Sequence, residues 1–102
     1  MTKSRIELDA RLCEILGSEY VYFQPPENIK LHYPCIIYKF DKFNTEKADN
    51  RDYLRGKRYE VTLIHRDPDN DIVEKLQDLL YCNLDRVFVT ENLYHYAFTL
   101  FY

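Results

Sequence analysis

The residues best suited to bind a metal ion lie in one short acidic segment. Asp67, Asp69 and Asp71 occupy positions 1, 3 and 5 of a possible calcium loop, and Asp78 falls at position 12. Such a loop needs glycine at position 6 for its sharp turn, but Ile72 stands there and begins a helical pattern. We therefore interpret the segment as the acidic start of a helix, where carboxylates lie beside the positive end of the helix dipole, and predict no metal site.

Histidine and cysteine offer no other reactive cluster. The three histidines lack the spacing of metal ligands, so structural roles are the simpler interpretation. Cys13, Cys35 and Cys82 contain no CxxC pair and lie among apolar neighbours, which predicts reduced, buried thiols. Two glycines cannot build a phosphate-binding loop, and no nucleophile motif is present. We expect no catalytic residue, no cofactor and no enzymatic activity.

Two segments of opposite charge remain as candidates for an interface. Residues 51–58 contain four basic side chains and one acidic one, whereas residues 67–78 contain five acidic and one basic. These segments are either two solvated faces or surfaces that meet, within one chain or between copies. An aromatic run also reaches the last residue, where chains usually fray, which suggests that this end is held by a partner. The candidate interface residues are Arg51, Arg55, Lys57, Arg58, Asp67, Asp69, Asp71, Phe101 and Tyr102.

The composition is typical of a single small globular domain covering residues 1–102. Hydrophobic residues make up 46% and charged residues 30%, enough for one core but not for a deep cleft beside it. The net charge of -3 argues against a protein that neutralises nucleic-acid phosphates, so we expect no sequence-specific nucleic-acid binding. No apolar stretch approaches the length of a membrane span, and the first residues lack a signal-peptide core. We expect no membrane partner and assembly in a cytoplasm.

The first half of the chain is expected to hold one helix and a strand pair. Residues 4–16 carry a helical apolar pattern with a capping box at Ser4 and a stop at Gly17. Residues 19–23, which precede two prolines, predict a short edge strand or an extended arm. Residues 35–43 and 58–66 predict two antiparallel strands, and the polar residues 44–56 between them predict a long functional loop.

The second half is expected to repeat this order with a helix and a hairpin. The helix begins after the acidic segment and buries Ile72, Leu76, Leu79 and Leu80. Residues 84–90 and 94–102 predict the two strands of the hairpin. The fold class is therefore expected to be α+β: two helices packed on one face of a four-stranded, mainly antiparallel sheet, in the order α-β-β-α-β-β.

Over nearly its full length, the chain also resembles a known family. It is similar to the tail terminator or tail completion proteins of long-tailed (siphovirus-type) bacteriophages, which belong to the head–tail joining region. The matching stretches are structural patterns rather than a catalytic signature, so the resemblance depends on their order. They are Tyr22-Phe-Gln-Pro-Pro26, Tyr33-Pro-Cys-Ile-Ile-Tyr38, Ala48-Asp-Asn50, Arg58-Tyr-Glu-Val-Thr62, Arg66-Asp-Pro-Asp69, and Asn92-Leu-Tyr-His95 with the closing Phe-Thr-Leu-Phe-Tyr.

The resemblance implies a structural virion protein of the phage neck. Copies of such a subunit would form a six-fold ring that terminates the tail tube and docks it to the head. Its partners would be other copies of itself, the tail tube protein and the head completion or stopper protein, with no catalysis and no cofactor. Two alternatives remain open: another neck protein, such as a head completion or stopper protein, or a non-viral small protein-binding module.

Overall fold

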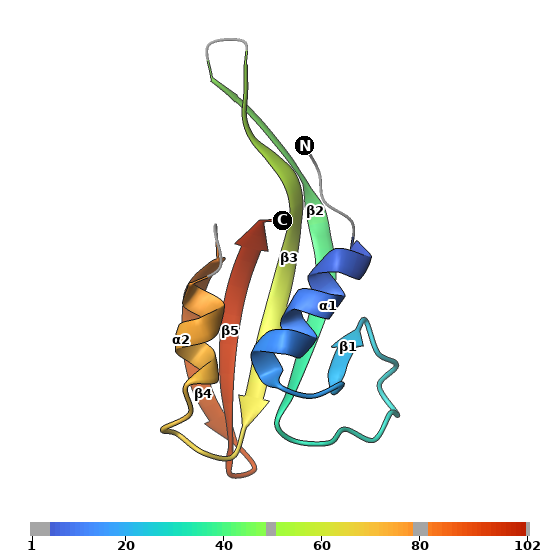
Figure 1. Ribbon diagram of the computed structural model, residues 1–102, viewed down its shortest axis with the longest axis vertical. Helices are drawn as coiled ribbons and strands as arrows, with labels where there is room; N and C mark the ends of the chain where they lie inside the picture. Colours follow the sequence, from blue (N-terminus) through green and yellow to red (C-terminus); the bar gives the residue numbers. More distant parts are fainter. Residues whose placement is uncertain (1–4, 49–50, 79–81, 102) are drawn as a thin grey trace.

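The chain folds into two helices and five strands. The computed structural model describes residues 5–48, 51–78 and 82–101, and the side chains of residues 5–41, 58–78 and 82–101 (Figure 1). Their order is α1 (Arg5–Leu16), β1 (Val21–Phe23), β2 (Cys35–Ala48), β3 (Arg51–His65), α2 (Ile72–Gln77), β4 (Cys82–Thr90) and β5 (Leu93–Phe101). The α1 helix ends where predicted, at Gly17, whose φ of 80° suits glycine; Ser4 lies outside the described residues.

The strands form one mixed sheet in the order β1-β2-β3-β5-β4. The β1 strand pairs with β2 in parallel, and all other neighbours are antiparallel. The prediction of a four-stranded sheet in the order α-β-β-α-β-β is therefore wrong. The extended segment before the two prolines is a fifth strand, β1, at the edge of the sheet, because its backbone pairs with β2 from Val21 to Phe23.

Both helices pack on one face of the sheet (Figure 1). The α1 helix buries Leu8, Leu12 and Leu16, and α2 buries Ile72 and Leu76, as their helical spacing predicts. Leu79 and Leu80, expected in the same stripe, lie outside the described residues. The sheet contributes alternating residues to this core, which confirms the predicted facing of its two central strands: Tyr59, Val61 and Leu63 from β3, and Tyr96, Phe98 and Leu100 from β5.

The β2 and β3 strands continue far beyond the rest of the sheet. The β5 strand ends at Phe101, opposite Arg58, but β2 and β3 remain paired with each other as far as Ala48 and Arg51. The predicted long loop over residues 44–56 is therefore wrong, since residues 44–48 and 51–56 belong to these two strands. We call residues 42–48 and 51–57 the arm. It makes the molecule elongated, with dimensions of 47 × 24 × 23 Å (Figure 1).

The C-terminal hairpin is confirmed, with a two-residue turn between β4 and β5. Glu91 and Asn92 both have positive φ, 52° and 63°, the left-handed conformation that two-residue hairpin turns require. Close pairing follows from Thr90 opposite Leu93 to Cys82 opposite Leu100, interrupted by a bulge between Leu84 and Arg86. This bulge, and the position of β4 at the outside of the sheet, determine which of its side chains face solvent.

Candidate interaction surfaces

The predicted basic and acidic segments lie at opposite ends of the molecule. Residues 51–58 begin β3 at the tip of the arm, and Asp67 follows the other end of this strand (Figure 1). Along β3, at about 3.3 Å per residue, Arg58 lies about 30 Å from Asp67, and Arg51 lies farther away, at the start of this 15-residue strand. The two segments therefore do not meet within one chain. A contact between neighbouring copies stays a prediction.

One member of the basic segment already has an acidic partner in its own chain. The side chains of Arg51, Arg55 and Lys57 lie outside the described residues. The Arg58 guanidinium lies 3.0 Å, from Nε to Oδ2, from the carboxylate of Asp41, which sits at the bulge in β2. Both side chains are about one third exposed, so water screens this ion pair only in part. Arg58 is thus less available to a second subunit than its charge alone suggests.

The acidic segment forms a compact turn that leads into α2. The amide of Asp69 donates to Asp67 Oδ1 at 2.9 Å, and Asp71 Oδ2 lies 3.4 Å from Lys75 Nζ. The side chain that caps the helix is Asn70, whose Oδ1 accepts hydrogen bonds from the amides of residues 72 and 73 at 3.1 and 3.3 Å. The segment is therefore the start of a helix, as predicted, but the side chain that caps the helix is that of Asn70 and not that of an aspartate.

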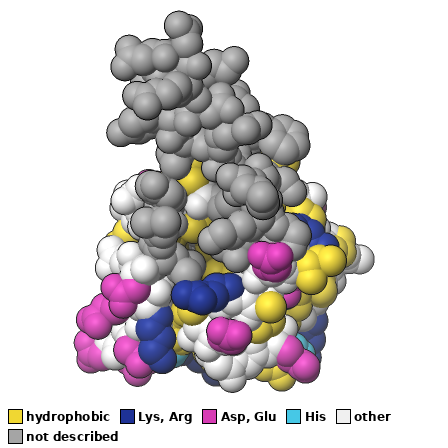
Figure 2. Space-filling view, turned by 45° about the horizontal axis from the view of Figure 1, so that its top comes forward, with side chains coloured by type: hydrophobic (Ala, Val, Ile, Leu, Met, Phe, Trp, Pro, Cys, Tyr) yellow, Lys and Arg dark blue, Asp and Glu magenta, His cyan; other side chains and the backbone are white. Residues whose placement is uncertain are grey.

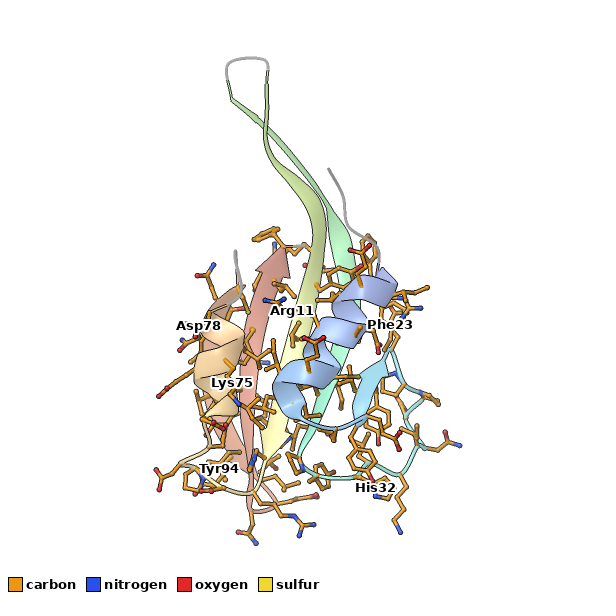
Figure 3. The ribbon with its side chains drawn as sticks, viewed as in Figure 1. Arg11, Phe23, His32, Lys75, Asp78 and Tyr94 are labelled. Carbon is orange, nitrogen blue, oxygen red and sulfur yellow. The ribbon has the colours of Figure 1, made fainter. Side chains whose placement is uncertain are left out.

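Acidic side chains consequently gather on the outside of α2. Asp67, Asp69 and Asp71 are exposed, as are Glu74 and Asp78. Figure 2 shows acidic side chains together at the side of the molecule where α2 lies, and Figure 3 shows Lys75 on the helix and Asp78 directly after its end. Since their charges remain in water, this surface can attract a basic partner.

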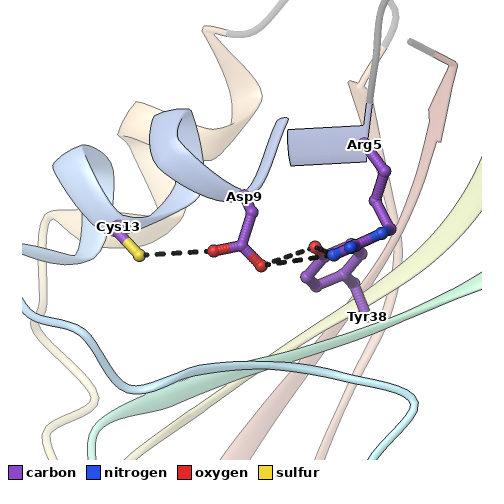
Figure 4. Close-up of polar contacts among 4 residues, drawn as sticks. All are labelled: Arg5, Asp9, Cys13 and Tyr38. Atoms are coloured by element: carbon purple, nitrogen blue, oxygen red, sulfur yellow. Dashed lines mark hydrogen bonds and ion pairs between the residues drawn. The ribbon is translucent and has the colours of Figure 1, made fainter. Parts of the chain in front are cut away.

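A polar network that the sequence did not reveal joins α1 to the sheet (Figure 4). The hydroxyl of Tyr38 donates to Asp9 Oδ2 at 2.6 Å and accepts from Arg5 Nη1 at 3.2 Å. The thiol of Cys13 donates to the other oxygen of Asp9 at 3.8 Å. The Arg5 guanidinium also stacks on the ring of Phe23 in β1, 4.4 Å from its centroid.

This network has the residue types of a catalytic site, but its tyrosine is buried and its thiol is not activated. Tyr38 has no exposed surface, and burial, followed by its hydrogen bond to Asp9, raises its pKa. Burial and the nearby Asp9 carboxylate also raise the pKa of the Cys13 thiol, which disfavours the nucleophilic thiolate. The arrangement therefore holds α1 against β1 and β2, and it favours the protonated forms of the Tyr38 hydroxyl and the Cys13 thiol.

The other two thiols are equally poor nucleophiles. Cys35 and Cys82 are buried, and all three cysteines are free. Burial raises the pKa of Cys35 to about 11 and that of Cys82 to about 12. The prediction of reduced thiols in apolar surroundings is confirmed for these two, whereas Cys13 is only half-buried.

The histidines lie in three separate environments. His32, on the connection after β1 (Figure 3), stacks on Tyr20 with ring centroids 4.9 Å apart. His65 Nδ1 accepts from the amide of residue 67 at 2.9 Å, and His95 stacks on Phe88 with centroids 4.8 Å apart. Within the described part of the chain, no three or more His, Cys, Asp or Glu side chains come together as metal ligands could.

The most exposed apolar surface is the outer edge of the sheet. On β4, Val87, Phe88 and Val89 are 50%, 39% and 57% exposed, and these three consecutive residues are large and hydrophobic. At the C-terminus, Phe101 is half-buried on the face away from the helices, and Tyr102 lies outside the described residues. The sequence predicted the β4 strand but not that it would form an edge.

Comparison with known proteins adds no relative to this description. No family model, no curated protein and no solved structure matches the chain. Neither helix in the described part of the chain has the length and apolar character that crossing a bilayer requires. The interpretation of function therefore depends on the chain's own surfaces and on the resemblance seen in its sequence.

Proposed function

We propose that the chain is a structural subunit of the head–tail joining region of a long-tailed phage. In this proposal, copies form a six-fold ring that ends the tail tube and docks it to the head. The observation that carries the proposal is the arm, in which β2 and β3 pair with each other beyond the end of β5. A two-stranded ribbon is at best marginally stable in water, so an arm of this length favours a protein that packs it against a partner.

The dimensions and charge of the arm support a second copy as that partner. Residues 42–48 span about 23 Å at 3.3 Å per residue, which is comparable to the shorter dimensions of the molecule, 24 and 23 Å. The arm contains five basic and two acidic residues, whereas the rest of the chain contains nine basic and fifteen acidic. An arm that lies on the body of the next copy makes a head-to-tail contact, the kind that closes rings.

The chemistry of the described residues supports a structural rather than a catalytic role. Arg5, Asp9, Cys13 and Tyr38 are engaged with one another, and the thiols have raised pKa values. A catalytic set needs a reactive group beside a cavity that a substrate can enter. The Tyr38 hydroxyl at the centre of the network is buried beneath α1, although Arg5 and Asp9 are partly exposed, and we assign these residues to holding the fold.

Inactivating the gene in its phage tests the proposal. Without a terminating ring, the tube should continue to grow, and electron micrographs of lysates should show overlong tails and DNA-filled heads without tails. Supplying the intact chain from a plasmid should restore tails of uniform length. Normal virions in the inactivated phage would refute the proposal, and unjoined tails of normal length would assign the chain to head completion instead.

A shortened arm provides the matched control. In this variant an Asn-Gly turn replaces residues 45–55, because Asn44 and Gly56 are paired and a two-residue turn can join them. The core is unchanged, so the variant should melt near the temperature of the intact chain and yet fail to restore normal tails. Full restoration by this variant would show that the arm has no part in assembly.

A further inference from the structure

The two edges of the sheet differ in how well they are protected. The β1 strand has only three residues and is followed by Pro25 and Pro26, which cannot donate to another strand. Gln24 extends this protection of the edge. Its backbone amide donates to Tyr38 O at 2.9 Å, and its side-chain Oε1 accepts from Phe40 N at 3.1 Å. A second chain therefore has little backbone to pair with at β1.

The opposite edge, β4, has none of these protections over residues 86–90. It contains no proline, all five residues are exposed, and the bulge lies before them, between Leu84 and Arg86. Asp85, at the bulge, accepts a hydrogen bond from the hydroxyl of Thr99 on β5. Long, exposed hydrophobic edges are the sites at which sheets pair with another strand.

The exposed hydrophobic residues are concentrated at this edge. Five large hydrophobic residues are exposed in the described part of the chain, and three of them are consecutive on β4. The other two, Ile6 and Ile29, are isolated on α1 and on the connection after β1. Isolated exposed residues need no explanation, but a continuous apolar strand at an open edge indicates an interaction surface.

The side chains of β4 are self-complementary. Val87 and Val89 lie opposite Tyr96 and Tyr94, on the helix face of the sheet, and Phe88 lies opposite His95 on the other face. In an antiparallel pair of two β4 strands centred on Phe88, each Val87 faces Val89 of the second copy and the two Phe88 rings face each other. All three exposed apolar residues thereby gain apolar neighbours.

Within the five paired residues, this register also avoids repulsion between like charges. Arg86 lies opposite residue 90 of the second copy, Thr90, and its guanidinium remains over the Phe88 ring, 5.2 Å from the centroid in the free chain. A register centred on Arg86 would oppose two guanidinium groups, and one centred on Val87 would set Val89 against Asp85. Within residues 86–90, the pairing centred on Phe88 sets no charged side chain against a like charge or an apolar group; just outside them, Asp85 at the bulge lies opposite Glu91 in the turn of the second copy.

We propose that two copies of this chain associate through β4, in antiparallel register about Phe88, to form a continuous ten-stranded sheet. A two-fold contact cannot by itself build a six-fold ring, so the pairing is independent of the proposed function. Five paired residues bury much less than a standard interface of roughly 1,600 Å², so we expect a dissociation constant on the order of 10 to 500 μM.

Sedimentation of the purified full chain over a concentration series tests the association. The wild type should shift from monomer to dimer, and Val89→Lys should weaken the dimer at least about tenfold, because a lysine at the edge opposes strand pairing. Ile6→Lys is the matched control: it places the same charge at a residue that is 73% exposed on α1, and it should leave the dimer unchanged. A wild type that stays monomeric at millimolar concentration, or equal weakening by both variants, overturns the proposal.

Cross-linking tests the register. With a mild oxidant, Phe88→Cys should form a covalent dimer, because the two residues 88 face each other. Thr90→Cys should not, since the two residues 90 are separated by about four residues, or roughly 13 Å, along the strands. The wild-type chain, treated in the same way, measures any background cross-linking through Cys13. Failure of Phe88→Cys to cross-link above both controls overturns the two-fold register, including the case in which β4 receives the arm of a second copy or a strand of another protein.

Discussion

Removing the hydroxyl of Tyr38 should destabilise the protein by releasing α1 from the sheet. Tyr38→Phe keeps the ring in the core but deletes the hydrogen bonds to Asp9 and Arg5, 2.6 and 3.2 Å long. Hydrogen bonds to charged groups are each worth about 1.5–3 kcal/mol. The Arg5 and Asp9 side chains are 38% and 35% exposed, so water replaces part of the lost interaction. We therefore expect a loss of about 1.5 kcal/mol in the free energy of unfolding, near the lower limit for one bond.

Thermal melting at neutral pH, followed by circular dichroism, measures this effect. In a domain of about 100 residues, 1 kcal/mol corresponds to about 4–8 °C, so Tm should fall by about 6–12 °C. Tyr59→Phe is the matched control. Tyr59 is equally buried in the core, but its hydroxyl has no hydrogen-bond partner among the described residues, and Tm should change by no more than about 2 °C. Equal melting temperatures for the two variants would refute the role assigned to the network.

Two further predictions concern assembly and alkaline stability. Arg55→Glu and Asp69→Arg should each impair ring assembly, and the double variant should restore it in electron micrographs; a double variant no better than the worse single one would rule out this pairing. Burial raises the pKa of Cys35 to about 11 and that of Cys82 to about 12, so the unfolded chain loses these protons first. Their contribution is complete below about pH 9 and falls above it, by up to about 1.4 kcal/mol per pH unit and thiol. Urea unfolding between pH 8 and 10 measures the fall, and a profile without it contradicts the burial of both thiols.

The elements that the sequence predicted correctly are those that cover the core. Leu8, Leu12 and Leu16 repeat at helical spacing because one side of α1 is buried, and Tyr96, Phe98 and Leu100 alternate because one side of β5 is buried. A periodic pattern of apolar residues arises where one face of a helix or strand is buried. Such a pattern therefore predicts a helix or strand that packs on a core.

The arm escaped prediction for the same reason. Residues 44–56 carry polar residues in most positions, and neither described helix lies over this part of β2 and β3 (Figure 1). Because apolar and polar residues do not alternate in this segment, a paired ribbon has the sequence pattern of a loop. Only the backbone pairing from Lys42 opposite Arg58 to Ala48 opposite Arg51 identifies it as two strands.

The polar network around Tyr38 and the exposed edge at β4 were not predicted, because each depends on contacts between residues that are distant in sequence. Arg5, Asp9 and Cys13 form a polar stripe at intervals of four residues on α1, but their shared partner, Tyr38, lies 29 residues beyond Asp9. Likewise, the apolar residues of β4 have the sequence pattern of an ordinary strand. Their exposure follows from the sheet order, in which β5 takes the inner position and leaves β4 outside.

The two proposals assign the β4 contact and the arm contact to different stages of assembly. The arm projects from one end of the sheet, whereas β4 forms one side, so a single copy can use both (Figure 1). A head-to-tail contact through the arm closes a ring, and a two-fold contact added to every member would join two rings. In the proposed function, the end of a tail tube takes one ring. We therefore expect the β4 pairs to separate as the ring forms, because a contact of five residues is weak enough for many simultaneous ring contacts to displace it. Pairing through β4 thus fits the free subunit, in which it covers the hydrophobic edge until the ring forms.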